Sequence, residues 1–70
     1  MYELICFTAD KSGDVAWREE CLTRYDGFVA LAGHVEGSGI TALAIHEMIY
    51  GCSDCVELPD GREIYFGLNA

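Results

Sequence analysis

The sequence has few basic residues: four lysines and arginines stand against 12 aspartates and glutamates, for a formal net charge of −8. Contact with nucleic-acid phosphates depends on lysine and arginine side chains, so this shortage argues against direct binding of DNA or RNA. It also disfavours adsorption to a membrane of anionic lipids. An acidic chain of this kind is suited to solubility, to cation binding or to docking onto a basic protein.

Long apolar runs are missing as well, and we do not expect residues 1–10 to be a secretory signal. No apolar run approaches the ~20 residues that a membrane-spanning helix requires. Residues 1–10 have no basic flank and include Glu3 and Asp10, which is not the pattern of a secretory signal peptide. We therefore expect a cytoplasmic protein without a membrane partner, whose cysteines stay reduced.

Motifs for catalysis are incomplete or absent. The stretch HEMIY at 46–50 begins like the zinc-protease motif H-E-x-x-H, but tyrosine stands where the second histidine is needed. The glycine-rich stretch EGSGIT at 36–41 lacks the lysine of a P-loop, and no G-x-S-x-G motif is present. A chain of 70 residues has little room for a deep pocket, so we expect neither enzyme activity nor a cofactor.

Cys52 and Cys55 form a C-x-x-C pair, a spacing found in zinc knuckles and in redox motifs. A structural zinc ion needs four ligands, and the other cysteines and both histidines supply no second closely spaced pair. A redox thiolate needs a helix N-terminus, whereas Cys52 follows a predicted helix end with acidic Asp54 nearby. The pair therefore indicates a helix-to-strand junction, and a zinc module that uses Cys52 and Cys55 is the alternative.

Apolar residues make up 51% of the chain, which is enough for the core of one compact domain over residues 1–70. Their spacing predicts an α+β fold, a two-layer α/β arrangement of a small mixed β-sheet with two helices on one face. We expect the order β-α-β-α-β-β with a C-terminal β-hairpin. Strands are predicted over 2–8, 28–35, 55–58 and 62–68, and helices over 14–26 and 41–50.

The first predicted helix depends on a spacing of four residues, because Trp17, Cys21 and Tyr25 fall at i, i+4 and i+8. Gly27 follows as a residue that can end a helix with a positive φ. The second helix has further signals, because Thr41 is a suitable N-cap and Gly51 stands where a helix-ending glycine is common.

The C-terminal hairpin has the clearest alternation of apolar and polar residues, which predicts that Glu57, Glu63 and Tyr65 share its outward face. Its loop, Pro59-Asp60-Gly61, matches a three-residue hairpin turn. Residues on one face of a strand recur about every 6.6–7 Å, close to the spacing of phosphates along a nucleic-acid strand. The predicted partner contacts are Glu57, Asp60 and Glu63 first, followed by Asp54, Glu36 and Tyr65.

Two interpretations of these acidic residues remain open. A row of carboxylates can imitate nucleic acid to a basic groove, with Tyr65 as an aromatic anchor. Alternatively, the charges keep a solvated sheet face from pairing edge to edge with other chains. The first interpretation predicts a non-enzymatic inhibitor or binding protein that docks its acidic face onto a basic nucleic-acid-binding protein, as a monomer or homodimer.

In size, acidity and mix of elements the chain resembles the small proteins that phages encode against host defences, and anti-CRISPR proteins in particular. The resemblance extends over the whole chain and carries no family site, because that group shares no motif. It implies an inhibitor in the host-cell cytoplasm whose partner is a CRISPR effector subunit, with the protein occupying a channel that otherwise holds nucleic acid.

Overall fold

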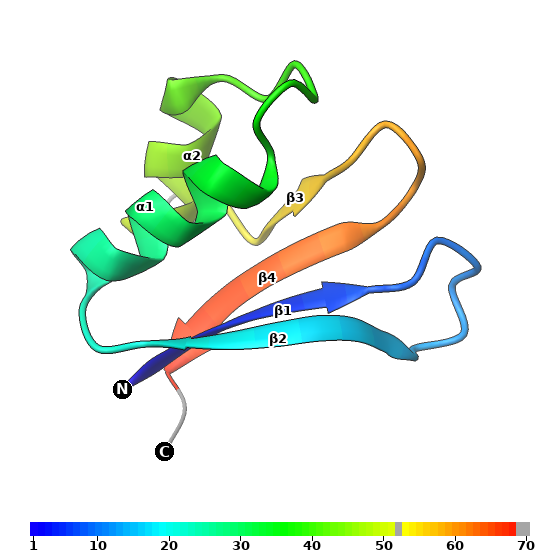
Figure 1. Ribbon diagram of the computed structural model, residues 1–70, viewed down its shortest axis with the longest axis horizontal. Coiled ribbons are helices and arrows are strands. Elements are labelled where there is room, and N and C mark those ends of the chain that lie inside the picture. The colour runs from blue at the N-terminus through cyan, green and yellow to red at the C-terminus, as the bar shows by residue number, and fades with distance from the viewer. Residues whose placement is uncertain (52, 69–70) are drawn as a thin grey trace.

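The computed structural model describes residues 1–51 and 53–68, which form a four-stranded sheet with two helices on one of its faces (Figure 1). The strand order is β2-β1-β4-β3, so β1 and β4 are the central strands. The predicted α+β class, with two helices and a C-terminal hairpin, is confirmed. The elements are β1 (Tyr2–Phe7), β2 (Val15–Cys21), α1 (Arg24–His34), α2 (Ala42–Ile49), β3 (Cys55–Glu57) and β4 (Glu63–Leu68).

Two predicted elements have the wrong type. The helix predicted over 14–26 is largely strand β2, and the strand predicted over 28–35 lies in helix α1. In chain order the elements run β-β-α-α-β-β, with the second and third exchanged relative to the prediction. Every pairing between the described strands is antiparallel, so the sheet is not mixed.

The spacing of Trp17 and Cys21 explains the first error, because four residues is a multiple of the strand period as well as about one helical turn. In β2 these two residues lie opposite Cys6 and Tyr2 of β1, on the side of the sheet that carries the helices. Alternation, and not helical periodicity, therefore places them on the same face.

Both helices begin at a threonine N-cap. Thr23 accepts a hydrogen bond of 3.1 Å from the backbone N–H of Asp26, and Thr41 accepts one of 3.1 Å from Ala44. The predicted N-cap of the second helix is thus confirmed, and Gly51 follows its end with a φ of 97°. Neither helix in the described part of the chain has the length and hydropathy to cross a membrane.

The core lies between the sheet and the helices. Tyr2 of β1 and Phe66 of β4 stack with ring centroids 5.1 Å apart, and Gly27 of α1 lies directly against the Phe66 ring. Arg24 extends over the Tyr2 ring and donates to a backbone carbonyl at the C-terminal end of α2, which ties the two helices together. The side chains without exposed surface are Leu4, Cys6, Leu31, Ile49 and Ile64.

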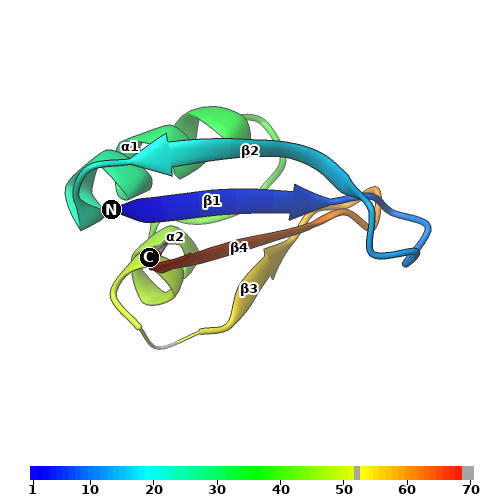
Figure 2. The same cartoon turned by 90° about the horizontal axis from the view of Figure 1, so that it is seen from below.

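The opposite face of the sheet is covered by no element of residues 1–51 or 53–68, and Figure 2 views the sheet from that side. Side chains alternate along each strand, so the buried residues point toward the helices. The residues directly before and after each of them point to the opposite face. We call this side the open face. Its members are Glu3, Ile5 and Phe7 of β1, Val15, Arg18 and Glu20 of β2, Cys55 and Glu57 of β3, and Glu63, Tyr65 and Gly67 of β4.

Substitution of Gly27 tests the close approach of α1 to the sheet. A Cβ at this position would lie 2.9 Å from Cζ of Phe66 and closer still to Cε1, so Gly27→Ala should destabilise the protein by about 1–3 kcal/mol through overpacking. Gly33 in the same helix has open space around it, and Gly33→Ala should stabilise by about 0.5–1 kcal/mol. Urea unfolding followed by circular dichroism measures both. Equal effects of the two substitutions would contradict this packing.

Candidate functional site

The residues predicted as partner contacts lie in separate places. Glu57, Glu63 and Tyr65 are on the open face, as the alternation of the hairpin predicted. Asp60 lies at the hairpin tip, where its carboxylate pairs with Arg62 at 2.7 Å. The predicted row of carboxylates is therefore interrupted at its tip by an internal ion pair.

The two remaining predicted residues belong to other depressions. Glu36 lines a shallow depression of about 280 Å³ together with His34 and Asp60. Asp54 lines another, of about 340 Å³, beside Arg24. Neither depression is on the open face, so the structure does not bring Glu36 or Asp54 together with the carboxylates of the hairpin strands.

Lys11 completes the cluster on the open face, a position that no pattern in the sequence predicted. Its ammonium lies 2.8 Å from Oε1 of Glu63 and 3.8 Å from Oε2 of Glu57, and 3.5 Å from the carbonyl of Gly61. Glu57 and Glu63 face each other across β3 and β4, an arrangement in which like charges repel. Lys11 bridges the two carboxylates and reduces that repulsion. The one available signal was that Lys11 is the only lysine of the sequence.

The loop between β1 and β2 holds Lys11 in place. Asp10 accepts hydrogen bonds from the hydroxyl of Thr8 at 2.7 Å and from the backbone N–H of Ser12 at 3.0 Å. These bonds lower the pKa of Asp10 to about 2, so its carboxylate is ionised at neutral pH. Lys11 itself has a φ of 63°, which is uncommon outside glycine and turns its side chain toward the hairpin.

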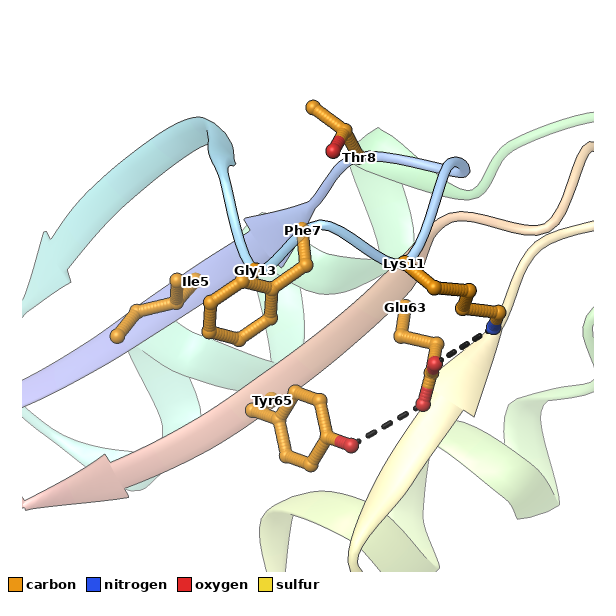
Figure 3. A pocket seen from close by; sticks show the side chains of 7 residues that line it. All are labelled: Ile5, Phe7, Thr8, Lys11, Gly13, Glu63 and Tyr65. Carbon is orange, nitrogen blue, oxygen red and sulfur yellow. Dashed lines mark hydrogen bonds and ion pairs between the residues drawn. The ribbon is translucent and has the colours of Figure 1, made fainter.

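A groove of about 530 Å³ crosses the open face beside this loop (Figure 3). Phe7 and Tyr65 form its apolar wall, with their rings in an edge-to-face arrangement and 5.5 Å between centroids. Ile5 extends the apolar surface along β1, while Lys11 and Glu63 form the polar end. The groove thus combines two aromatic rings with a carboxylate within one small site.

Three titratable groups at the polar end depend on one another. The hydroxyl of Tyr65 donates to Oε2 of Glu63 at 3.0 Å, and this bond is the main reason that the pKa of Tyr65 rises to about 12. The hydrogen bond from Lys11, followed by that from Tyr65, lowers the pKa of Glu63, and the same contact raises the pKa of Lys11. At neutral pH the groove therefore contains an ionised carboxylate, a charged ammonium and a neutral phenol, which suits binding of charged groups.

The wider open face is acidic. Arg18 approaches Glu3 to 3.8 Å between β2 and β1, and Glu20 lies opposite Glu3 in the register of these strands. Carboxylates outnumber basic groups on the open face, because Glu3, Glu20, Glu57 and Glu63 stand against Arg18 and Lys11.

The cysteines divide between the two sides of the sheet. Cys6 and Cys21 are free thiols buried under the helices, and burial is the main cause of their raised pKa values. Cys55 is a free, partly buried thiol on the open face, 3.6 Å from Oε2 of Glu63, and burial again raises its pKa most. Cys52, the other member of the C-x-x-C pair, lies outside the described residues. Within residues 1–51 and 53–68 no three metal-ligating side chains gather that could hold a metal ion.

The two histidines lie away from the groove. His34 stacks on Trp17 with centroids 3.8 Å apart, and its Nε2 is 2.6 Å from Oε2 of Glu19. His46 packs against Tyr50 on α2, with ring centroids 4.6 Å apart. The geometry of His34 matches the hydrogen-bonding role of a partly exposed side chain that joins β2 to the end of α1.

Removal of Lys11 tests the ion pair at the groove. Lys11→Met should raise the pKa of Glu63 toward its ordinary value of 4.5, because the hydrogen bond from Lys11 is the largest cause of the depression. Carboxyl-carbon chemical shifts of Glu63 as a function of pH measure this change. Lys11→Arg keeps the positive charge and serves as the matched control, with a smaller shift expected.

The sign of the accompanying stability change follows from the depressed pKa. Ionised Glu63 stabilises the folded protein above the unfolded-state pKa, and this contribution is lost as the pH falls through the lower folded-state pKa. Lys11→Met should therefore be less stable than the native protein above pH 4.5, and the difference should shrink below it. An unchanged pKa of Glu63 in Lys11→Met would contradict the assignment.

Comparisons with known proteins assign no family to this chain. No protein-family model, no curated protein and no solved structure matches the chain. What the protein does must therefore be inferred from the open face, its charges and its groove.

Proposed function

We propose that the protein is a non-enzymatic inhibitor that docks its open face onto a basic, nucleic-acid-binding protein. The observation that carries the proposal is the uncovered sheet face itself, on which Phe7 and Tyr65 line a groove with the carboxylate of Glu63 at its polar end. Tyr65 is exposed and Phe7 is partly exposed, and aromatic side chains amid charged groups are typical of protein interfaces. The net charge of −8 favours a partner of opposite charge.

The two kinds of side chain serve different steps of binding. Carboxylates around the groove attract a basic surface over a distance and speed association, an effect that salt screens over about 8–10 Å at 0.1–0.15 M ionic strength. Phe7 and Tyr65 then supply buried apolar contact, because aromatic rings bury a large area with few rotatable bonds. Affinity would come mainly from the rings, and speed and partner choice mainly from the charges.

The proposal includes mimicry of nucleic acid, but not by the continuous row of carboxylates that the sequence predicted. Glu57 and Glu63 share Lys11, and Asp60 is paired with Arg62, so a continuous row of free charges is not what the partner would meet. The partner would meet an acidic border around an aromatic groove, which resembles stacked bases flanked by phosphates. The resemblance in size and charge to anti-CRISPR proteins supports a CRISPR effector subunit in the host cytoplasm as the partner.

Capture from a host-cell lysate with three baits tests this function. The baits are the native protein, Glu57→Lys on the open face, and Glu47→Lys on the exposed side of α2, which changes the net charge by the same amount. A true partner should bind the native and Glu47→Lys baits and should bind Glu57→Lys at least about tenfold more weakly, as for a lost interface charge pair.

Competition separates a nucleic-acid-binding groove from other basic surfaces. The captured protein, once purified, should be displaced from the native bait by single-stranded or duplex DNA or by RNA, and its binding should weaken as salt rises. Capture that is equal for Glu57→Lys and the native protein, or that nucleic acid does not displace, would overturn the proposed function.

A further inference from the structure

The groove already contains one cation, and this cation comes from the protein itself. Figure 3 shows the ammonium of Lys11 against the carboxylate of Glu63, next to the apolar wall formed by Phe7 and Tyr65. Tyr65 donates to the other oxygen of the same carboxylate, which fixes its orientation. A carboxylate oxygen accepts more than one hydrogen bond, so the orientation imposed by Tyr65 leaves Glu63 able to bind another donor.

The chemistry of this site fits a guanidinium better than an ammonium. An arginine side chain is planar, stacks on aromatic rings and donates two parallel hydrogen bonds to a carboxylate. The groove offers the faces or edges of two rings beside one carboxylate. The ammonium of Lys11 uses the carboxylate and makes no cation–π contact with either ring among the described residues.

The ion pair between Lys11 and Glu63 is exposed, so another cation can readily replace Lys11. Its side chain is 59% exposed, and only its 2.8 Å contact with Glu63 is short, whereas those with Glu57 and Gly61 are long. Exposed ion pairs contribute little and are weakened by salt. A guanidinium that adds ring stacking to the same ion pair therefore has an advantage over the resident ammonium.

We propose that the groove receives an arginine side chain of the basic partner and that Lys11 holds the cation position of this site in the free protein. The inference rests on the proposed function and specifies which group of the partner is recognised. On binding, Lys11 leaves Glu63 and turns toward solvent, and the arginine pairs with Glu63 while it packs on Phe7 and Tyr65. Lys11 then acts as a built-in competitor that weakens the binding of any cation, and the rings of Phe7 and Tyr65 favour arginine over lysine.

Two peptides of equal charge test this inference, one with three arginines and one with three lysines separated by glycine. Binding is followed by NMR titration of the ring signals of Phe7 and Tyr65 in low salt. The arginine peptide should bind about two- to fivefold more tightly than the lysine peptide, the range expected for an exposed cation–π contact. Glu63→Gln should remove this preference.

Removal of the competitor should strengthen binding. Lys11→Met should bind the arginine peptide about two- to fivefold more tightly than the native protein, because one exposed ion pair no longer has to be broken. Arg62→Met is the matched control, since it also removes one positive charge but at the hairpin tip, where Arg62 pairs with Asp60. It should strengthen binding less than Lys11→Met does.

The outcomes separate the inference from the proposed function. Equal binding of the two peptides, or an equal gain for Lys11→Met and Arg62→Met, with shifts still on the open face, overturns the arginine site and leaves the docking face in place. If neither peptide shifts any signal of Phe7 or Tyr65, the arginine site is overturned. If the capture experiment also fails to separate Glu57→Lys from Glu47→Lys, the docking face is overturned with it.

Discussion

The packing of both helices on one side of the sheet, α1 on β1 and β2 and α2 on β3 and β4, is the constraint on which the rest of the structure depends. Leu4 and Cys6 of the central strand β1 are fully buried on the helix side, and strand alternation then directs Ile5 and Phe7 to the other side. Because both helices lie on one side of the sheet, no helix of the described chain covers these apolar side chains. The open face is thus a direct consequence of how a small two-layer domain builds its single core.

The same architecture explains why Lys11 matters in an acidic chain. The antiparallel hairpin of β3 and β4 places Glu57 and Glu63 opposite each other, and the loop after β1 ends beside them. One lysine therefore reduces a repulsion that the hairpin creates, and it does so at the edge of an aromatic groove. The carboxylate of Glu63 belongs both to the ion pair with Lys11 and to the proposed binding site. Binding of a partner cation would therefore compete with an ion pair of the fold.

Sequence reasoning succeeded where a local pattern had one interpretation. The C-terminal hairpin followed from its alternation and its Pro59-Asp60-Gly61 turn, and α2 followed from its N-cap at Thr41. It failed between 14 and 35, where a spacing of four residues suits both a helix and a strand, and where the N-cap at Thr23 went unrecognised. For the candidate site, Glu57, Glu63 and Tyr65 were placed on the correct face, while Lys11 and Phe7 were missed.

The sequence by itself determined the α+β class, the acidic character and the outward direction of Glu57, Glu63 and Tyr65, because composition and short-range alternation are local properties of the chain. Only the tertiary structure decided that β2 pairs with β1, that Lys11 reaches Glu63, and that Phe7 faces Tyr65. These contacts join residues that are far apart in the chain, except along the β1–β2 hairpin. Their geometry depends on which strands are neighbours in the sheet, and no local pattern in the sequence records that choice.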